Sequence, residues 1–236
     1  MDKIITTSWD DGHPLDFRIA ALLEKYHLKG TFYIPRCGTG HAIMSEAEIA
    51  VLGRDFEIGG HTLHHVNLRR EDHNKQREEI EGCYQWLGDL TGRSPRSFCP
   101  PFGAINQLAK SIVSKAGFQT IRTTELLSTR IHPDCQSTTL QLYPHSALTY
   151  AKHLLIRRRF PELQFWLATG QLTDILALTD LYLDVVERKG GCFHLWGHSW
   201  EIEKLNLWGR LESVIQHLSQ RSGYQYLENG EMAPIV

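Results

Sequence analysis

The sequence lacks the cysteine pattern of a disulfide framework or of a cysteine-bound zinc site. Its five cysteines are odd in number, lie far apart and include no Cys-x-x-Cys pair, which is typical of reduced thiols. Long apolar runs are also missing, because no stretch approaches the roughly 20 residues that a membrane-spanning helix requires. We therefore expect no structural disulfide and no membrane partner.

An excess of charge of one sign is missing as well. The 25 lysines and arginines nearly balance the 27 aspartates and glutamates, which leaves a net charge of −2 and a sequence pI of about 6.7. No long basic stripe is interleaved with aromatic residues, so nucleic acid is not an expected partner. Met1 stands three residues before the first predicted strand, which leaves no room for a signal peptide and predicts a cytoplasmic protein.

No internal repeat, low-complexity tract or linker divides the chain, and its 42% apolar content suffices for one large core. We predict a single domain over residues 1–236. Strand-like and helix-like patterns alternate along it, which predicts an α/β protein with a parallel sheet or barrel. The predicted strands are residues 4–9, 31–34, 57–59, 97–99, 120–123 and 191–196, and the predicted helices are residues 14–27, 45–52, 71–90, 105–116 and 211–218. Residues 131–178 carry the weakest pattern and are expected to be largely helical.

Two adjacent acids, Asp10 and Asp11, directly follow the first predicted strand. Both can serve one site only if the chain has left the strand there, which Gly12 and Pro14 permit. Neighbouring carboxylates repel each other, and a metal cation removes the conflict by binding one acid and leaving the other as a base. Because active sites of parallel α/β proteins lie at the carboxyl ends of strands, the pair predicts a catalytic site.

Two histidines, His61 and His65, follow the third predicted strand and stand four residues apart. This spacing places both imidazoles on one face of a helical turn, where they can chelate a single ion. With Asp11 they form a ligand set that leaves coordination positions open for water and substrate. Zinc is the first expectation, and the set also suits cobalt, nickel or iron. His64 remains an alternative ligand.

These segments resemble the motifs of the polysaccharide deacetylase family (carbohydrate esterase family four), which includes chitin and peptidoglycan deacetylases. The matching segments, in family order, are Ser8-Trp9-Asp10-Asp11, His61-Thr62-x-x-His65, a partial match in Cys99-Pro100-Pro101-Phe102-Gly103, and Phe193-His194-Leu195-Trp196-Gly197-His198. The resemblance implies a distorted (β/α) barrel of about seven parallel strands. Periodicity alone does not distinguish such a barrel from an open sheet.

The resemblance also implies a role in the reaction for each candidate residue. Asp11, His61 and His65 would bind the metal, and Asp10 would act as the general base on a metal-bound water. Among the remaining roles, the oxyanion would be held by the metal and by the backbone N–H of Phe102 within the segment Pro101–Gly103, and His198 would protonate the leaving amine. Trp200, close to His198, is a candidate for stacking on a sugar or for lining an acyl pocket.

One position departs from the family pattern. Cys99 stands where the family usually has an arginine that pairs with the base, and Arg122 on the next predicted strand is the better candidate to replace it. Arg96 is a poor one, because an offset of three residues along a strand points it to the other face. The family's fourth motif has no clear match, and the candidates to orient His198 are Asp174, Asp180 and Asp184.

The sequence therefore predicts a metal-dependent amide hydrolase that removes an acyl group, first of all acetyl, from an N-acylated sugar. A cytoplasmic location favours a small or activated sugar over a cell-wall polymer. The alternatives are a deformylase or an allantoinase-like hydrolase of another C–N bond, or a carbohydrate-binding barrel with weak catalysis. The run Arg157–Arg159 either meets a substrate phosphate or is a solvated face. The sequence leaves the oligomeric state open.

Overall fold

The computed structural model describes residues 2–132 and 135–235, which form a single α/β domain. Within these residues, eight parallel strands follow the order β6-β5-β4-β3-β2-β1-β8-β7 and curl into a half-barrel, and β9 pairs with β1 beside this path. The strands are β1 (Lys3–Asp10), β2 (Thr31–Ile34), β3 (Glu57–Gly60), β4 (Ser97–Phe98), β5 (Thr120–Arg122), β6 (Cys135–Gln136), β7 (Leu140–Gln141), β8 (Gly191–Gly197) and β9 (Gln225–Tyr226). The predicted α/β barrel with about seven parallel strands is confirmed.

Strand β1 is the centre of the sheet. Residues 4–10 are all buried, as expected for a parallel strand that is covered on both faces. On one side β1 pairs along most of its length with β8. On the other side its amino-terminal half pairs with β9 and its carboxyl end pairs with β2. The last residue of β1, Asp10, is paired with Tyr33 of β2.

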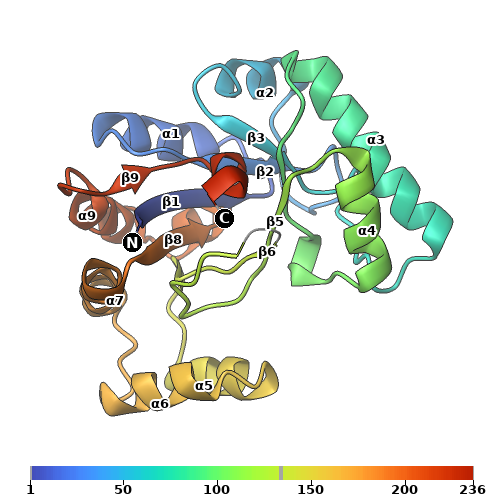
Figure 1. Ribbon diagram of the computed structural model, residues 1–236. Coiled ribbons are helices and arrows are strands. Elements are labelled where there is room, and N and C mark those ends of the chain that lie inside the picture. Colours follow the sequence, from blue (N-terminus) through green and yellow to red (C-terminus); the bar gives the residue numbers. More distant parts are fainter. Residues whose placement is uncertain (1, 133–134, 236) are drawn as a thin grey trace.

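The helices lie mostly around the outside of the curled sheet (Figure 1). They are α1 (Asp16–Lys25), α2 (Glu46–Leu52), α3 (His73–Thr91), α4 (Gln107–Ala116), α5 (Ala147–Ile156), α6 (Phe160–Ala168), α7 (Ile175–Lys189), α8 (Ser199–Lys204) and α9 (Trp208–Leu218), with the 3-10 turns η1 (Pro101–Gly103) and η2 (Asn229–Ile235). Local signals set the ends of α3, since the Asp72 side chain accepts a hydrogen bond from the Lys75 N–H and Gly92 ends the helix at φ 66°.

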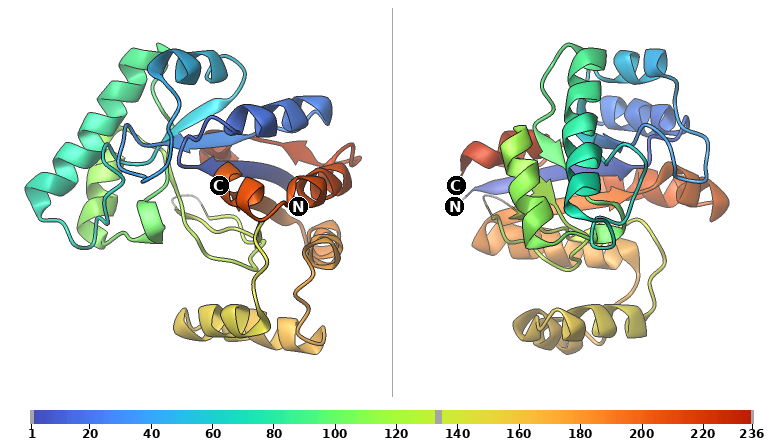
Figure 2. Two further views of the ribbon diagram at one scale, coloured as in Figure 1. Left: turned by 180° about the vertical axis from the view of Figure 1, so that it is seen from behind. Right: turned by 90° about the vertical axis from the view of Figure 1, so that its right-hand side faces the viewer.

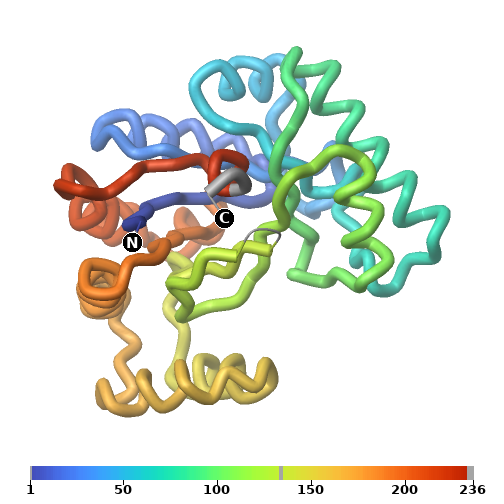
Figure 3. The backbone as a smooth tube through the Cα atoms, in the orientation of Figure 1, coloured from blue at the N-terminus to red at the C-terminus, as the bar shows by residue number. Residues whose placement is uncertain are grey.

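The stretch between β5 and α7 is built differently from the rest. The strands β6 and β7 are only two residues long, which is too short for a period-two pattern, and the sequence did not predict them. Helices α5 and α6 form a pair that stands away from the body of the domain (Figure 2). The chain leaves the sheet after β7, runs through this pair and returns to α7 (Figure 3). Among the residues that the structure describes, no helix is both long enough and apolar enough to cross a membrane.

Candidate active site

The two acids lie at the carboxyl edge of the sheet. Asp10 is the last residue of β1, and Asp11 and Gly12 leave the strand with φ angles of 79° and 62°. A Cβ at position 12 would lie 2.5 Å from a side-chain carbon of Ile34, so both the space and the left-handed backbone favour glycine. The early departure from the strand brings both carboxyl groups to one site, as the sequence predicted.

Asp11, His61 and His65 converge as a possible metal site. The Oδ1 atom of Asp11 lies 3.6 Å from Nε2 of His61 and 3.2 Å from Nε2 of His65, and the three donor atoms lie within 4.8 Å of one another. This oxygen is buried and accepts no hydrogen bond from the described residues. Burial alone would raise the pKa of Asp11, but the two histidines lower it well below its ordinary value. Two nitrogens and a carboxylate oxygen fit a divalent cation such as zinc.

The predicted helical turn between the two histidines is wrong. Thr62 and His65 have φ angles of 63° and 51°, and the segment is an irregular loop. Buried Glu79 of α3 holds it there by accepting hydrogen bonds from the backbone N–H groups of Leu63 (2.9 Å) and His64 (2.8 Å). The His64 ring also contacts Glu79, with 2.7 Å between Nδ1 and Oε1. His64 is therefore engaged away from Asp11, whereas His61 and His65 point toward it.

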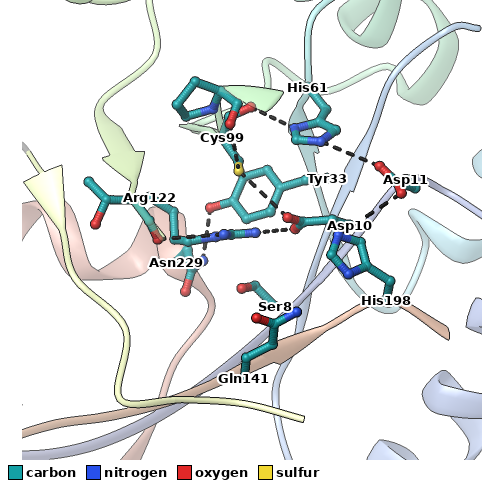
Figure 4. Close-up of polar contacts among 12 residues, drawn as sticks. Ser8, Asp10, Asp11, Tyr33, His61, Cys99, Arg122, Gln141, His198 and Asn229 are labelled. Atoms are coloured by element: carbon teal, nitrogen blue, oxygen red, sulfur yellow. Dashed lines mark hydrogen bonds and ion pairs between the residues drawn. The ribbon is translucent and has the colours of Figure 1, made fainter. Parts of the chain in front are cut away.

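The orientation of His61 depends on a backbone group. Its Nδ1–H donates to the carbonyl oxygen of Cys99 at 2.6 Å, which leaves Nε2 as the atom that faces Asp11 (Figure 4). Fixing the ring through its second nitrogen is the usual arrangement for a metal-binding histidine. Because the acceptor is a main-chain carbonyl, the contact does not depend on the side chain at position 99.

Arg122 occupies the place that the sequence proposed for it. The guanidinium, with no solvent exposure, forms an ion pair with Oδ1 of Asp10 (Figure 4). Cys99 is a packed thiol whose Sγ lies 3.8 Å from Oδ2 of the same aspartate, and burial raises the pKa of this thiol well above its ordinary range. Arg96 points elsewhere and pairs with Glu228 at 3.0 Å. Arg122, at the end of strand β5, thus gives Asp10 the positively charged partner that position 99 does not provide.

His198 is oriented by Glu201, one turn further along in α8. Its Nδ1–H donates to Oε2 of Glu201 at 2.6 Å, and its Nε2 lies 4.0 Å from Oδ2 of Asp11. Burial alone would lower the pKa of His198, but the Glu201 hydrogen bond and the charges of Asp10 and Asp11 raise it. The N–H of the Gln141 side chain also donates to Glu201, at 3.2 Å.

The three aspartates proposed to orient His198 were therefore wrong. Asp174 caps α7 and pairs with Arg210, while the other two form pairs on the surface, Asp180 with His217 at 2.8 Å and Asp184 with Arg188 at 3.0 Å. Spacing could have identified the correct residue, because an acid three positions after a histidine at a helix start lies on the same face.

Residues 101–103, within the partial match to a family motif, form part of the rim of the site. In η1, Phe102 has φ 60° and an exposed ring that lies edge-on to His65, with 4.9 Å between ring centroids. Gly103 is also left-handed, and a Cβ there would lie 2.3 Å from Oγ1 of Thr124. In residues 2–132 and 135–235, none accepts a hydrogen bond from the Phe102 N–H. This donor, preceded by Pro101, is available to an incoming oxygen.

Trp200 contacts Asp11, one of the three candidate metal ligands, directly. Its Nε1–H donates to Oδ2 of Asp11 at 2.9 Å, and its ring stacks on His41, with 4.0 Å between centroids. The residue is half-buried, so one part of it supports the ligand and another faces the rim. The direct bond to Asp11 adds a positioning role that the sequence did not suggest.

Asp16 was also missed. It lies in the first turn of α1, a position where acids are normally exposed, yet it is fully buried. Burial raises its pKa well above the ordinary range, and the nearby charges of Asp11 and Asp10 act in the same direction.

Comparisons with known proteins agree on one family. Its profile, described as "Polysaccharide deacetylase", matches residues 1–121. A peptidoglycan deacetylase of Helicobacter pylori is 26% identical over 104 residues, which are 43% of this chain and 34% of that protein. A peptidoglycan-N-acetylglucosamine deacetylase of Bacillus cereus is 29% identical over 108 residues, which are 44% of this chain and 38% of that protein. The matches thus span little more than a third of each relative.

Solved structures match over nearly the whole chain. The Xyl-CE4 domain of a multidomain xylanase from the hindgut metagenome of Trinervitermes trinervoides has a TM-score of 0.60 at 16% identity and covers 100% of this chain and 91% of its own. A CE4 family pseudoenzyme from Bacillus anthracis has a TM-score of 0.58 at 13% identity, with 98% and 66% covered. At these identities the likeness establishes the fold alone.

Proposed function

Because this chain belongs to the polysaccharide deacetylase family, we propose that it is a metal-dependent hydrolase that removes an N-acyl group, first of all acetyl, from an amino sugar. The observation that carries the proposal is the convergence of Asp11, His61 and His65 between two groups that can move protons, Asp10 and His198. A base and an acid on the two sides of a metal site are what amide hydrolysis requires.

We assign the steps of the reaction to individual residues. A bound divalent cation, zinc first, would polarise the acyl carbonyl and acidify the attacking water. Asp10, which is paired with Arg122, accepts the proton that the water loses as its oxygen adds to the carbonyl carbon. The Phe102 N–H donates to the developing oxyanion. His198, held by Glu201, donates a proton to the amine nitrogen as the C–N bond breaks, and the products are a carboxylate and a free amine.

The rim favours a sugar as the substrate. Phe102 is 69% exposed and Trp200 is half-buried, so two aromatic rings border the acids and can pack on the apolar face of a pyranose. We propose a small or activated N-acylated sugar in the cytoplasm.

Two alternative functions share some features with the proposed one. A deformylase or an allantoinase-like hydrolase would use the same acid, base and ligands on another C–N bond. A carbohydrate-binding barrel with weak or no catalysis was suggested by Cys99 and by the missing fourth motif, and the ion pair of Arg122 with Asp10 weakens the first of these arguments. A binding protein has no need of a base and an acid beside a metal site.

Acetate release from N-acetylated sugars tests the proposal. The zinc-loaded protein is incubated with free, oligomeric and nucleotide-linked N-acetylglucosamine, and acetate and formate are both measured. Asp10→Asn and His198→Ala should retain the metal but lose about 10²- to 10⁴-fold in turnover, while the control His64→Ala should retain activity. Wild-type turnover in either variant would remove the acid and base assignments. Formate release would favour deformylation, and sugar binding without product would favour the binding protein.

A further inference from the structure

Exposed apolar side chains gather on one part of the molecule, the α5–α6 hairpin (residues 147–168). Of the ten large apolar residues that are exposed in the described part of the chain, six belong to this hairpin. They are Leu148 (77% exposed), Leu155 (51%), Ile156 (69%), Phe160 (54%), Phe165 (37%) and Leu167 (48%). Single exposed apolar residues are common on proteins, whereas a cluster of this size marks a binding surface.

On α5 the exposed residues form one helical face. Leu148, Lys152, Leu155 and Ile156 follow one another at intervals of three or four residues or adjacently, while Tyr150 and Leu154 are buried on the other side. This burial pattern shows that α5 is attached to the protein by one face and presents a second apolar face to the outside.

Helix α6 repeats the arrangement. Phe160, Gln164 and Leu167 are exposed at helical spacing, and Trp166 is buried. A cavity of about 570 Å³, lined in part by Phe165 of α6 and Tyr182 of α7, lies between the hairpin and the body. The hairpin thus projects from the domain (Figures 1 and 2), and many of its residues are exposed.

The hairpin is also locally basic. It contains Lys152, Arg157, Arg158 and Arg159 but only one acid, Glu162, which gives it a formal charge of +3 in a chain of net charge −2. Arg157 and Arg159 pair with Glu125 and Glu162. Lys152 and Arg158 are exposed beside the apolar residues.

We propose that the outer face of the α5–α6 hairpin docks onto an anionic lipid surface. Apolar side chains flanked by lysine and arginine are the pattern of helices that lie in the plane of a membrane interface. The apolar residues enter the acyl boundary, and Lys152 and Arg158 reach the phosphates of the headgroups. The expectation of no membrane partner considered only membrane-spanning runs, and this surface requires none.

A second copy of the chain fits this face less well than lipid does. In a two-fold contact each patch meets its own equivalent. Lys152 and Arg158 of one copy would then lie close to the same cations of the other, in a contact that supplies few acids of its own. An anionic surface instead neutralises both residues.

Vesicle co-sedimentation of the full chain tests the proposal and does not depend on hydrolytic activity. The probes are vesicles of phosphatidylcholine alone and vesicles in which about a third of the lipid is phosphatidylglycerol. We expect binding to the anionic vesicles only, weakened by added salt because salt screens charge. The variants Lys152→Gln/Arg158→Gln and Leu155→Gln/Ile156→Gln should each lower the vesicle-bound fraction, expressed as a partition coefficient, by about tenfold or more.

The matched control lies on α4, which has the same length as α5 and carries exposed Leu108 and Lys115. The variant Leu108→Gln/Lys115→Gln should bind as the wild type does, and circular dichroism should show native helix content in all three variants. The proposal is overturned by absence of binding to anionic vesicles at low salt, or by hairpin variants that bind normally. A concentration-dependent dimer that the hairpin variants dissociate would assign this face to a second copy instead.

Discussion

The first five strands and the stretch from β5 to α7 position their side chains by different means. In the first region, strands that pair in parallel end at one edge, and they deliver Asp10 and Arg122 at strand ends and His61 and Cys99 directly after them. In the second region, the two-residue strand β7 places the side chain of Gln141 against Glu201. Backbone hydrogen bonds between paired strands fix the residues of the first region within a buried core. Much of the surface of the second region is exposed to solvent.

The two regions are therefore suited to different tasks, the first to catalysis and the second to contact with a partner. Reacting groups must be held within fractions of an ångström, which paired strands achieve and projecting helices do not. A surface that meets a partner needs exposure more than precision, and the α5–α6 hairpin supplies exposure. The two largest effects are expected at residues of the first region and at the metal ligands next to it, and two smaller effects are expected at residues outside both regions.

Loss of a metal ligand should have the largest effect. Asp11→Ala, His61→Ala and His65→Ala should each weaken metal binding by at least about 100-fold and abolish turnover, because all three donors converge on one point. Elemental analysis after gel filtration measures the retained metal, and His64→Ala is the control. Retention of metal in His65→Ala together with its loss in His64→Ala would mean that the ligand set is wrongly assigned.

Removal of Arg122 should come next. Arg122→Met leaves Asp10 buried without its ion-pair partner, and such a loss typically costs about 3–5 kcal/mol of unfolding free energy. Cys99→Ala removes only a packed thiol and should cost about 1–2 kcal/mol. Chemical denaturation measures both.

The double variant Asp10→Asn/Arg122→Met provides the control for this pair. It should recover part of the stability that Arg122→Met loses, because the carboxylate that needs the guanidinium is no longer there. Equal damage from Cys99→Ala and Arg122→Met would show that the thiol supports the base and would end the role given to Arg122.

A smaller effect is expected from Glu201→Gln. The carboxylate raises the pKa of His198 against the opposing effect of burial, so its neutralisation should lower that pKa. A general acid must be protonated, and the basic limb of the pH–rate profile should therefore move to lower pH. Turnover at the optimum should fall by about tenfold, less than in His198→Ala. Asp180→Asn, which also removes a carboxylate paired with a histidine, is the control, and an unmoved basic limb would contradict the role of Glu201.

The smallest effect lies outside both regions, at Glu228. Burial, with the charges of Glu57 and Glu231, raises its pKa to about 7. Because this value exceeds that of the unfolded chain, its contribution to stability is complete at low pH and is lost as pH rises through about 7. Glu228→Gln should therefore raise the unfolding free energy above about pH 8 by on the order of 1 kcal/mol after allowance for solvent screening, and should change it little near pH 4. Thermal denaturation at both pH values measures the difference.

The sequence predicted where most strands end and which residues stand there, and it missed most of the contacts that orient those residues. The end of β1 followed from the strand pattern, and the pairing of Arg122 with Asp10 followed from the arginine expected by family resemblance and from the position of Arg122 on the next predicted strand. The loop at His61 to His65 did not, because Glu79, distant in sequence, imposes its backbone. The spacing of three residues could have identified Glu201 as the partner of His198, but the family pattern led us to consider aspartates only. Exposure of the hairpin could not be read from its composition, since an apolar helix is buried or exposed according to its neighbours.

Glu79 has a consequence for how the proposed metal site would bind an ion. It is fully buried and fixes the loop between the two histidines through two backbone bonds and the His64 ring. These contacts involve none of the proposed ligands, so the loop that carries two of them is pre-organised without an ion, and metal binding would cost little conformational freedom. Unlike a zinc finger, whose folding is driven by its metal, the domain would stay folded while the proposed site exchanged one cation for another. Metal supply and relative affinity would then decide which cation occupies the site.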